Sequence, residues 1–217
     1  ESVSRFDFAT LCDMHHYFFQ DIYEWAGKIR IINIEKSEPA LGGISIEYSD
    51  CFDIIKDATY VLDKMNHYTW EKASLDEVAE IFSKYLAELW KVHPYREGNT
   101  RTVITFCSQF IESKGFYIDS DLFKDNAQYM RTALVAANAL FSDLGDKRKP
   151  EYLEKIVLDA LERGREMKQR VSGIIKKAGY RVTERTIRKI VYWNRLERYE
   201  HGERDVRLYL LQNRECE

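Results

Sequence analysis

The sequence predicts an all-α protein with one small β-hairpin, and three observations lead to this fold class. Apolar residues recur at three-and-four spacing from about Ala73 to Val92, which is typical of an amphipathic helix. A second helical pattern runs from about Asn99 to Ser113, and Gly115 marks its end. Only 3 prolines occur among 217 residues, so few positions interrupt helices.

Residues 29–48 predict the hairpin. Ile29–Ile34 is rich in β-branched side chains, and Ile44–Tyr48 alternates apolar and polar residues. The turn region Pro39–Gly43 separates these two segments. We expect an exposed hairpin edge here, and such an edge can recruit a peptide as an added strand.

The stretch His93–Arg101 (HPYREGNTR) joins the two predicted helices and is the most informative part of the chain. Pro94 disfavours helical geometry at the preceding residue, so the first helix should end at His93. His93 then lies one turn beyond Leu89 and Trp90, on the inward face of that helix. The stretch is therefore predicted to be a helix end, a tight loop and a helix start.

The residue types of this stretch suit the binding of phosphate and metal. Gly98 lets the backbone approach a ligand, and Asn99 can cap the second helix, whose free N–H groups favour an anion. Arg101 adds a permanent cation that can hold phosphate oxygens, and Glu97 is a hard oxygen ligand for Mg²⁺. His93 suits a general base because its ordinary pKa lies near neutrality. Together they predict a metal-nucleotide site with a base beside it.

This stretch resembles the motif of the Fic family, His-Pro-Phe-x-Asp/Glu-Gly-Asn-Gly/Lys-Arg-x-x-Arg. The resemblance extends to Leu11–Arg30, which is similar to the first core helix of the family and its Tyr-x-Trp-Ala-Gly turn. The predicted hairpin at 29–48 occupies the position of the family's flap, which aligns the target segment. The resemblance covers roughly residues 8 to 160.

The resemblance implies a helical core that uses Mg-ATP to transfer AMP to a Ser, Thr or Tyr hydroxyl of a protein target or of the chain itself. His93 would be the base that deprotonates this hydroxyl, and Glu97 would hold Mg²⁺. The residues implied for the nucleotide phosphates are Gly98, Asn99, Thr100 and Arg101. The flap hairpin would dock the target protein.

Three positions depart from the motif of the family. Tyr95 replaces Phe, Thr100 replaces Gly or Lys, and Ile104 stands where the second Arg is expected. The loss of that cation should weaken the binding of the β- and γ-phosphates. Alternative functions are therefore a phosphoryl transferase, an enzyme that removes AMP, or a Fic-like scaffold whose basic tail binds a partner.

Regulation in this family often uses a helix with a Ser/Thr-x-x-x-Glu-Gly/Asn pattern, and neither end of this chain carries one. Two interpretations follow from the resemblance. The inhibitory element lies upstream or on a separate antitoxin-like partner, or the site is altered and has no such inhibition.

Charge divides the chain into two predicted units, residues 1–162 and 163–217. The second unit holds 15 Lys/Arg against 8 Asp/Glu, whereas the first holds 18 against 28. We expect the boundary near Arg163-Gly164, at the end of a helix that begins after Pro150. The tail predicts further helices over Met167–Lys177, Thr183 to about Tyr199, and Asp205–Gln212.

The basic tail has several possible roles. Thr183–Lys189 partly resembles the second helix of a helix-turn-helix, but its spacing from Gly179 differs by about two residues, so nucleic acid is not an expected partner. The tail could instead dock on the acidic first unit, on an acidic partner or on a membrane face. The plainest interpretation is a solvated basic bundle that caps the core.

Other histidine sites are weaker candidates. His15 shares the apolar face of its helix and is predicted to be a hydrogen-bonded core residue. Zinc bound by His93 and Glu97 is disfavoured, because no second His or Cys lies at helical spacing from them. The sequence has no apolar run that could span a bilayer and no secretion signal at its start, so we expect a cytoplasmic protein, with delivery into a host cell left open.

Overall fold

The structure is a computed structural model, and it describes residues 5–196 and 203–212. The chain divides into two compact units, with the division between Leu161 and Glu162. Helices make up most of the described residues, so the predicted all-α fold class is confirmed. Within this described part, no helix is long and apolar enough to cross a membrane.

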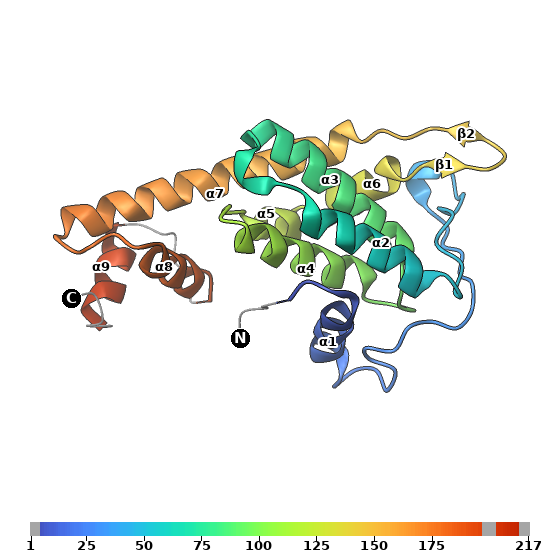
Figure 1. Ribbon diagram of the computed structural model, residues 1–217, viewed down its shortest axis with the longest axis horizontal. Helices are drawn as coiled ribbons and strands as arrows, with labels where there is room; N and C mark the ends of the chain where they lie inside the picture. The colour runs from blue at the N-terminus through green and yellow to red at the C-terminus, as the bar shows by residue number, and fades with distance from the viewer. Residues whose placement is uncertain (1–4, 197–202, 213–217) are drawn as a thin grey trace. The chain divides into compact units, whose positions relative to one another are not determined.

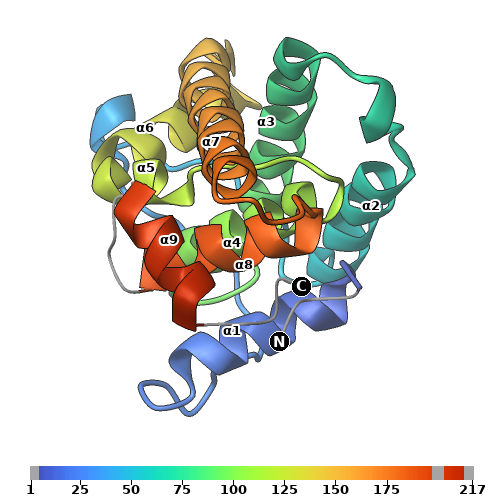
Figure 2. The same cartoon turned by 90° about the vertical axis from the view of Figure 1, so that its left-hand side faces the viewer.

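Four helices form the core of the first unit. Helices α2 (Ile54–His67), α3 (Leu75–Val92) and α4 (Asn99–Ser113) lie side by side, and α1 (Phe8–Phe19) packs beneath α4 in both Figure 1 and Figure 2. Helix α6 (Ala127–Ala137) packs on α3. Large apolar side chains fill the space between them, among them Trp70, Phe82, Trp90, Phe106 and Phe110. Burial of such side chains supplies most of the stability of the unit.

Short elements complete the first unit. These are η1 (Pro39–Leu41), η2 (Trp70–Lys72), α5 (Ser120–Asp125), β1 (Leu140–Phe141) and β2 (Gly145–Asp146). The two strands pair antiparallel, with Leu140 opposite Asp146, and make a small hairpin (Figure 1).

The predicted bounds of α3 and α4 agree closely with the structure. The Ser74 hydroxyl caps α3 by accepting a hydrogen bond from the backbone N–H of Glu77, at 3.2 Å. The buried stripe of α3 includes Phe82, Leu86 and Trp90, at the spacing that the sequence predicts. Helix α3 ends at Val92, immediately before His93 and Pro94.

The predicted hairpin at residues 29–48, called the flap segment from here on, is wrong in its secondary structure. The segment contains η1 but no strand. Ile31 and Ile32 are 75% and 61% exposed, so their β-branched side chains lack the half-buried surface that favours a strand. The buried Arg30 guanidinium donates to the carbonyls of Ile32 and Ser49, so these carbonyls are turned toward a side chain and not toward the N–H groups of a neighbouring strand.

Helix α7 (Glu151–Lys177) begins in the first unit, where Leu153 and Val157 join the core, and continues into the second unit. The second unit also contains α8 (Glu184–Leu196) and α9 (Glu203–Gln212). The predicted helix end near Arg163-Gly164 is wrong, because α7 continues without a break. Its buried stripe continues past Gly164, with Leu161, Met167, Val171 and Ile175 buried, and this outweighs the cost of about 1 kcal/mol for a helical glycine. The predicted end of the next helix near Tyr199 lies outside the described residues.

Candidate active site

The backbone turns sharply between α3 and α4. His93 has φ 49° and ψ 59°, and it is the one non-glycine residue with positive φ in the described chain. The Arg30 side chain donates to the His93 carbonyl at 2.9 Å, and its backbone N–H donates to the Pro94 carbonyl at 2.8 Å. A left-handed conformation at a non-glycine residue costs free energy, so the surrounding contacts must hold it in place. Such strain is common in functional sites.

The His93 imidazole is 1% exposed, and neither ring nitrogen has a hydrogen-bond partner among the described residues. Its ring lies 4.1 Å from the ring of Tyr48 and 5.4 Å from that of Trp90, measured between centroids. Burial and, to a smaller extent, the nearby cations of Lys36 and Arg131 together lower the pKa of His93 to about 3. The ring is therefore neutral at pH 7 and has a free lone pair that can accept a proton.

Asn99 holds the loop in a way that differs from the predicted cap. The residue that caps α4 is Gly98, and Asn99 is the first residue of the helix. Its side-chain oxygen accepts from the Tyr95 N–H at 2.8 Å, and its amide donates to the Tyr95 carbonyl at 2.6 Å. Both ends of the buried amide are thus used to close the loop. The prediction of Asn99 as the cap was wrong, because its side chain bonds to the backbone of Tyr95, four residues earlier, and not to an N–H of the helix.

Gly98 is required by both backbone and packing. It has φ +82°, and an added Cβ would lie 2.4 Å from a ring carbon of Phe19. His15 packs on the same side, is fully buried, and stacks on the Tyr95 ring at 3.7 Å. Its Nδ1 accepts from the Gly27 N–H at 2.8 Å, so its Nε2–H donates to the Glu97 carbonyl at 3.0 Å. The prediction of a hydrogen-bonded core histidine is confirmed.

The start of α4 presents unpaired backbone donors. The first helical hydrogen bond from this turn runs from the Thr102 N–H to the Gly98 carbonyl, at 3.1 Å. The N–H groups of Asn99, Thr100 and Arg101 precede it and have no acceptor in the helix. The positive end of the helix dipole adds to these donors, so this end of α4 attracts an anion.

Three side chains near the start of α4 make different contacts: those of Thr100, Arg101 and Ile104. The Thr100 hydroxyl accepts from the buried Trp90 Nε1–H at 2.9 Å, so it points toward α3. The Arg101 guanidinium lies over the Phe19 ring, 5.4 Å from its centroid. Ile104 is partly buried and packs against the core. The position of the second motif arginine is thus apolar.

Glu97 meets a residue that the sequence did not single out. The Lys36 ammonium lies 3.2 Å from a carboxylate oxygen of Glu97 and 3.5 Å from the Arg96 carbonyl. The Glu97 side chain is 61% exposed, and that of Lys36 is 22% exposed. Lys36 comes from the flap segment, so this segment reaches the motif loop even though it forms no hairpin.

A second contact fixes the flap segment over the site. The Glu38 carboxylate, 2% exposed, accepts from Arg131 of α6 at 2.7 Å and from the Tyr48 hydroxyl at 3.3 Å. Glu47 also accepts from the backbone and the hydroxyl of Ser142, beside β1. These residues were not predicted, because their partners lie about 90 positions away in the sequence and no local pattern marks them.

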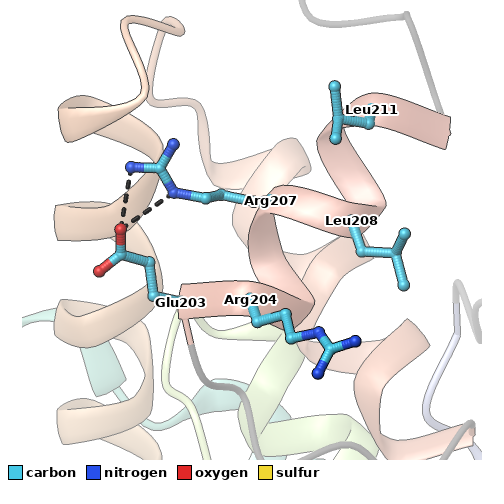
Figure 3. Close-up of a pocket in the computed structure, with 5 residues that line it drawn as sticks. All are labelled: Glu203, Arg204, Arg207, Leu208 and Leu211. Atoms are coloured by element: carbon cyan, nitrogen blue, oxygen red, sulfur yellow. Dashed lines mark hydrogen bonds and ion pairs between the residues drawn. The ribbon is translucent and has the colours of Figure 1, made fainter.

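The described residues also form a surface hollow in the second unit, which involves none of the predicted site residues. Five residues of α9 line it: Glu203, Arg204, Arg207, Leu208 and Leu211 (Figure 3). Arg207 is already paired with Glu203, at 2.9 Å.

The fold and the site define a class of protein: a helical core in which a neutral histidine follows the end of one helix and a short loop leads from it to the anion-binding start of the next helix. Residues 5–111 match the Fic/DOC family. We conclude that this part of the chain belongs to the Fic/DOC family, as the motif predicted.

Curated relatives and solved structures agree with this assignment. The chain is 34% identical over 122 residues to a probable protein adenylyltransferase y4lH of Sinorhizobium fredii, covering 52% of this chain and 56% of that protein. It is 32% identical over 117 residues to the protein adenylyltransferase VbhT of Bartonella schoenbuchensis, covering 54% of this chain and 23% of VbhT. The chain therefore spans about half or less of the length of these relatives.

The fold is also similar to that of a solved effector protein of Bartonella. The structure of BepC from Bartonella tribocorum, with bound AMPPNP, matches with a TM-score of 0.53 and 19% identity. The match covers 73% of this chain and 76% of that one.

Proposed function

We propose that the first unit is a protein adenylyltransferase, which transfers AMP from Mg-ATP to a Ser, Thr or Tyr hydroxyl of a target protein or of itself. The observation that carries the proposal is a short loop that joins two features: His93, whose ring nitrogens have no hydrogen-bond partner among the described residues, and the N–H groups at the start of α4, which have no acceptor within the helix. The similarity to relatives that are named protein adenylyltransferases supports it.

The nucleotide would bind at the start of α4. The N–H groups of Asn99, Thr100 and Arg101 would donate to phosphate oxygens, and the Arg101 guanidinium would add a cation. Gly98 would let the phosphates approach the backbone closely. The AMPPNP complex of BepC supports the capacity of this fold to hold such a ligand.

Mg²⁺ would be held by Glu97. Mg²⁺ keeps several waters and takes one or two carboxylates together with substrate phosphates, and the exposed Glu97 carboxylate fits that demand. No group of three or more acidic, His or Cys side chains gathers in the described part of the chain, so water and phosphate would supply the other ligands. The bound ion would neutralise phosphate charge.

His93 would act as the base. The target hydroxyl gives its proton to the imidazole, its oxygen bonds to the α-phosphorus, and the bond to the β-phosphate breaks so that pyrophosphate leaves. The phosphate charges beside the ring raise the pKa of His93 from its low value, which favours this proton transfer. Because Tyr48 covers the ring, the flap segment has to shift to admit the hydroxyl.

The flap segment is the proposed docking site for the target protein. Its backbone carries no strand partner, and its Ile31, Ile32 and Ile44 side chains are exposed, so an extended peptide could pair along it. An inhibitory partner or upstream helix and a cytoplasmic location stay predictions of the family resemblance.

The test is to incubate the protein with Mg-ATP, alone and with a cell lysate, and to measure intact and peptide masses. An added mass of about 329 Da, the value for adenylyl transfer to a hydroxyl, is expected for the wild type and should be lost in His93→Ala. Glu97→Ala should lose Mg-dependent nucleotide binding as well. Full activity of His93→Ala would contradict the mechanism, and an added mass of about 80 Da would indicate phosphoryl transfer instead.

A further inference from the structure

We propose that Lys36 is a nucleotide-binding residue, whose ammonium group contacts the polyphosphate of ATP and replaces the motif arginine that is absent at Ile104. This inference rests on the proposed function, because it takes the start of α4 as the phosphate site. Lys36 lies outside the motif, in the flap segment, and would bind the triphosphate of the nucleotide.

The position of Lys36 supports this role. Its ammonium lies within 3.5 Å of both the Glu97 carboxylate and the Arg96 carbonyl, so it already sits on the motif loop. Its backbone N–H donates to the Ser45 hydroxyl at 3.0 Å, which ties the two arms of the flap segment together. The side chain is directed at the loop and not into solvent, since only 22% of it is exposed.

The other cations near His93 are committed elsewhere. The Arg30 guanidinium is buried and donates to backbone carbonyls, among them that of His93. Arg131 is paired with the buried Glu38 carboxylate at 2.7 Å. Lys36 holds a partly exposed pair with Glu97 and a long contact of 3.5 Å with the Arg96 carbonyl, and such interactions are weak. Of Arg30, Arg131 and Lys36, it is Lys36 that can change partner at the lowest cost.

Charge exchange makes the two roles of Glu97 compatible. Without nucleotide, the Lys36 ammonium neutralises the carboxylate. When Mg-ATP binds, Glu97 becomes a metal ligand and the ammonium is left beside the phosphate oxygens. A lysine suits this exchange, because its charge sits at the end of a flexible chain of four carbons. An arginine at position 104 would instead be fixed on α4.

The opposite role is also testable. If the Lys36–Glu97 pair served only to block the metal ligand, removal of Lys36 would strengthen nucleotide binding. The two roles therefore predict changes in opposite directions for the same substitution.

The experiment measures the binding of Mg-bound α,β-methylene ATP, which cannot transfer AMP, and of AMP, to the wild type and to Lys36→Met by calorimetry. We expect the triphosphate to bind about tenfold more weakly or worse in Lys36→Met, as for other charge-assisted contacts, and AMP binding to change much less. Lys36→Arg should keep most of the affinity. Lys56→Met is the matched control, because Lys56 forms an exposed pair with Asp53 on α2.

A second variant sharpens the result. Ile104→Arg, placed in the Lys36→Met background, should restore triphosphate affinity if the two positions serve the same phosphates, provided that thermal unfolding shows an intact fold. Unchanged or tighter binding by Lys36→Met would overturn the assignment of Lys36. If the wild type binds neither nucleotide, the proposed function itself fails, and this inference fails with it.

Discussion

The motif loop, residues 93–101, and the flap segment, residues 29–48, meet at the same site but are held differently. Some contacts inside the loop join residues that are close in sequence, such as the two hydrogen bonds between Asn99 and Tyr95. The flap segment is held by distant partners, since Glu38 pairs with Arg131 and Glu47 with Ser142. The loop is thus closed by a pair of hydrogen bonds between its own residues and supported from outside by Arg30 and His15. The buried and bonded carboxylates of the flap segment depend on partners more than 90 positions away.

The largest expected effect comes from breaking the loop at Gly98. Gly98→Ala would put a Cβ 2.4 Å from a Phe19 ring carbon at φ +82°, so we expect a loss of about 3 kcal/mol in the free energy of unfolding. Gly42→Ala is the control in the flap segment: it has φ +65° but no described atom within 4 Å of the added Cβ, so it should cost about 1 kcal/mol. Urea unfolding measures both. Equal losses would show that the loop is not the more tightly packed region.

The next effect concerns acid and the buried His93. Its pKa in the folded protein, about 3, lies below the ordinary value of 6.5, so the unfolded chain takes up the proton first as the pH falls. The free energy of unfolding should therefore decrease below pH 6.5, by about 2 kcal/mol between pH 7 and pH 5 from this residue. His15, whose pKa burial also lowers, acts in the same direction.

Urea unfolding at the two pH values checks this expectation. His93→Asn should reduce the loss on acidification, because asparagine does not titrate and tolerates a left-handed backbone. The exposed His67→Asn is the control and should leave the loss unchanged. An acid loss as large in His93→Asn as in the wild type would contradict the burial argument.

The smallest effect should come from releasing the flap segment. Arg131→Met removes the ion-pair partner of the Glu38 carboxylate, which is 2% exposed and keeps only the Tyr48 hydroxyl as a donor among the described residues. Because the Arg131 side chain is itself 41% exposed, we expect a loss of about 1 to 2 kcal/mol in the free energy of unfolding. Amide hydrogen exchange should become faster in residues 36–48 but not in residues 95–101. Arg148→Met, which removes an exposed pair with Asp146, is the control and should change neither the free energy of unfolding nor the exchange rates of these residues. Faster exchange in the loop would mean that the two regions are not held independently.

The same contrast decides what could be predicted from sequence. Helices α3 and α4 were predicted almost to the residue, because apolar periodicity and Pro94 act locally. The prediction of strands in the flap segment was wrong, because β-branched content alone cannot show that the Arg30 guanidinium bonds to the carbonyls of Ile32 and Ser49. Lys36 and Arg131 were missed for a similar reason, as each meets its partner only through the fold.

Within the loop, sequence reasoning named the right residues but could not assign every contact. Asn99 was predicted as a cap and instead closes the loop, since an amide so close to a helix start has several backbone partners in reach. Glycine was expected at position 98 because it allows the close approach of a ligand. The structure adds a second reason, since a side chain there would clash with Phe19, which lies almost 80 positions away.

The closed ring between Asn99 and Tyr95 makes the loop sensitive to a change of a single atom. Hydrolysis of the Asn99 amide to a carboxylate would replace the donor that faces the Tyr95 carbonyl with another oxygen, so two electron-rich atoms would meet at hydrogen-bond distance. It would also leave a negative charge at the start of α4, where a phosphate is proposed to bind. Chemical ageing at this one side chain would thus both loosen the turn and repel the substrate.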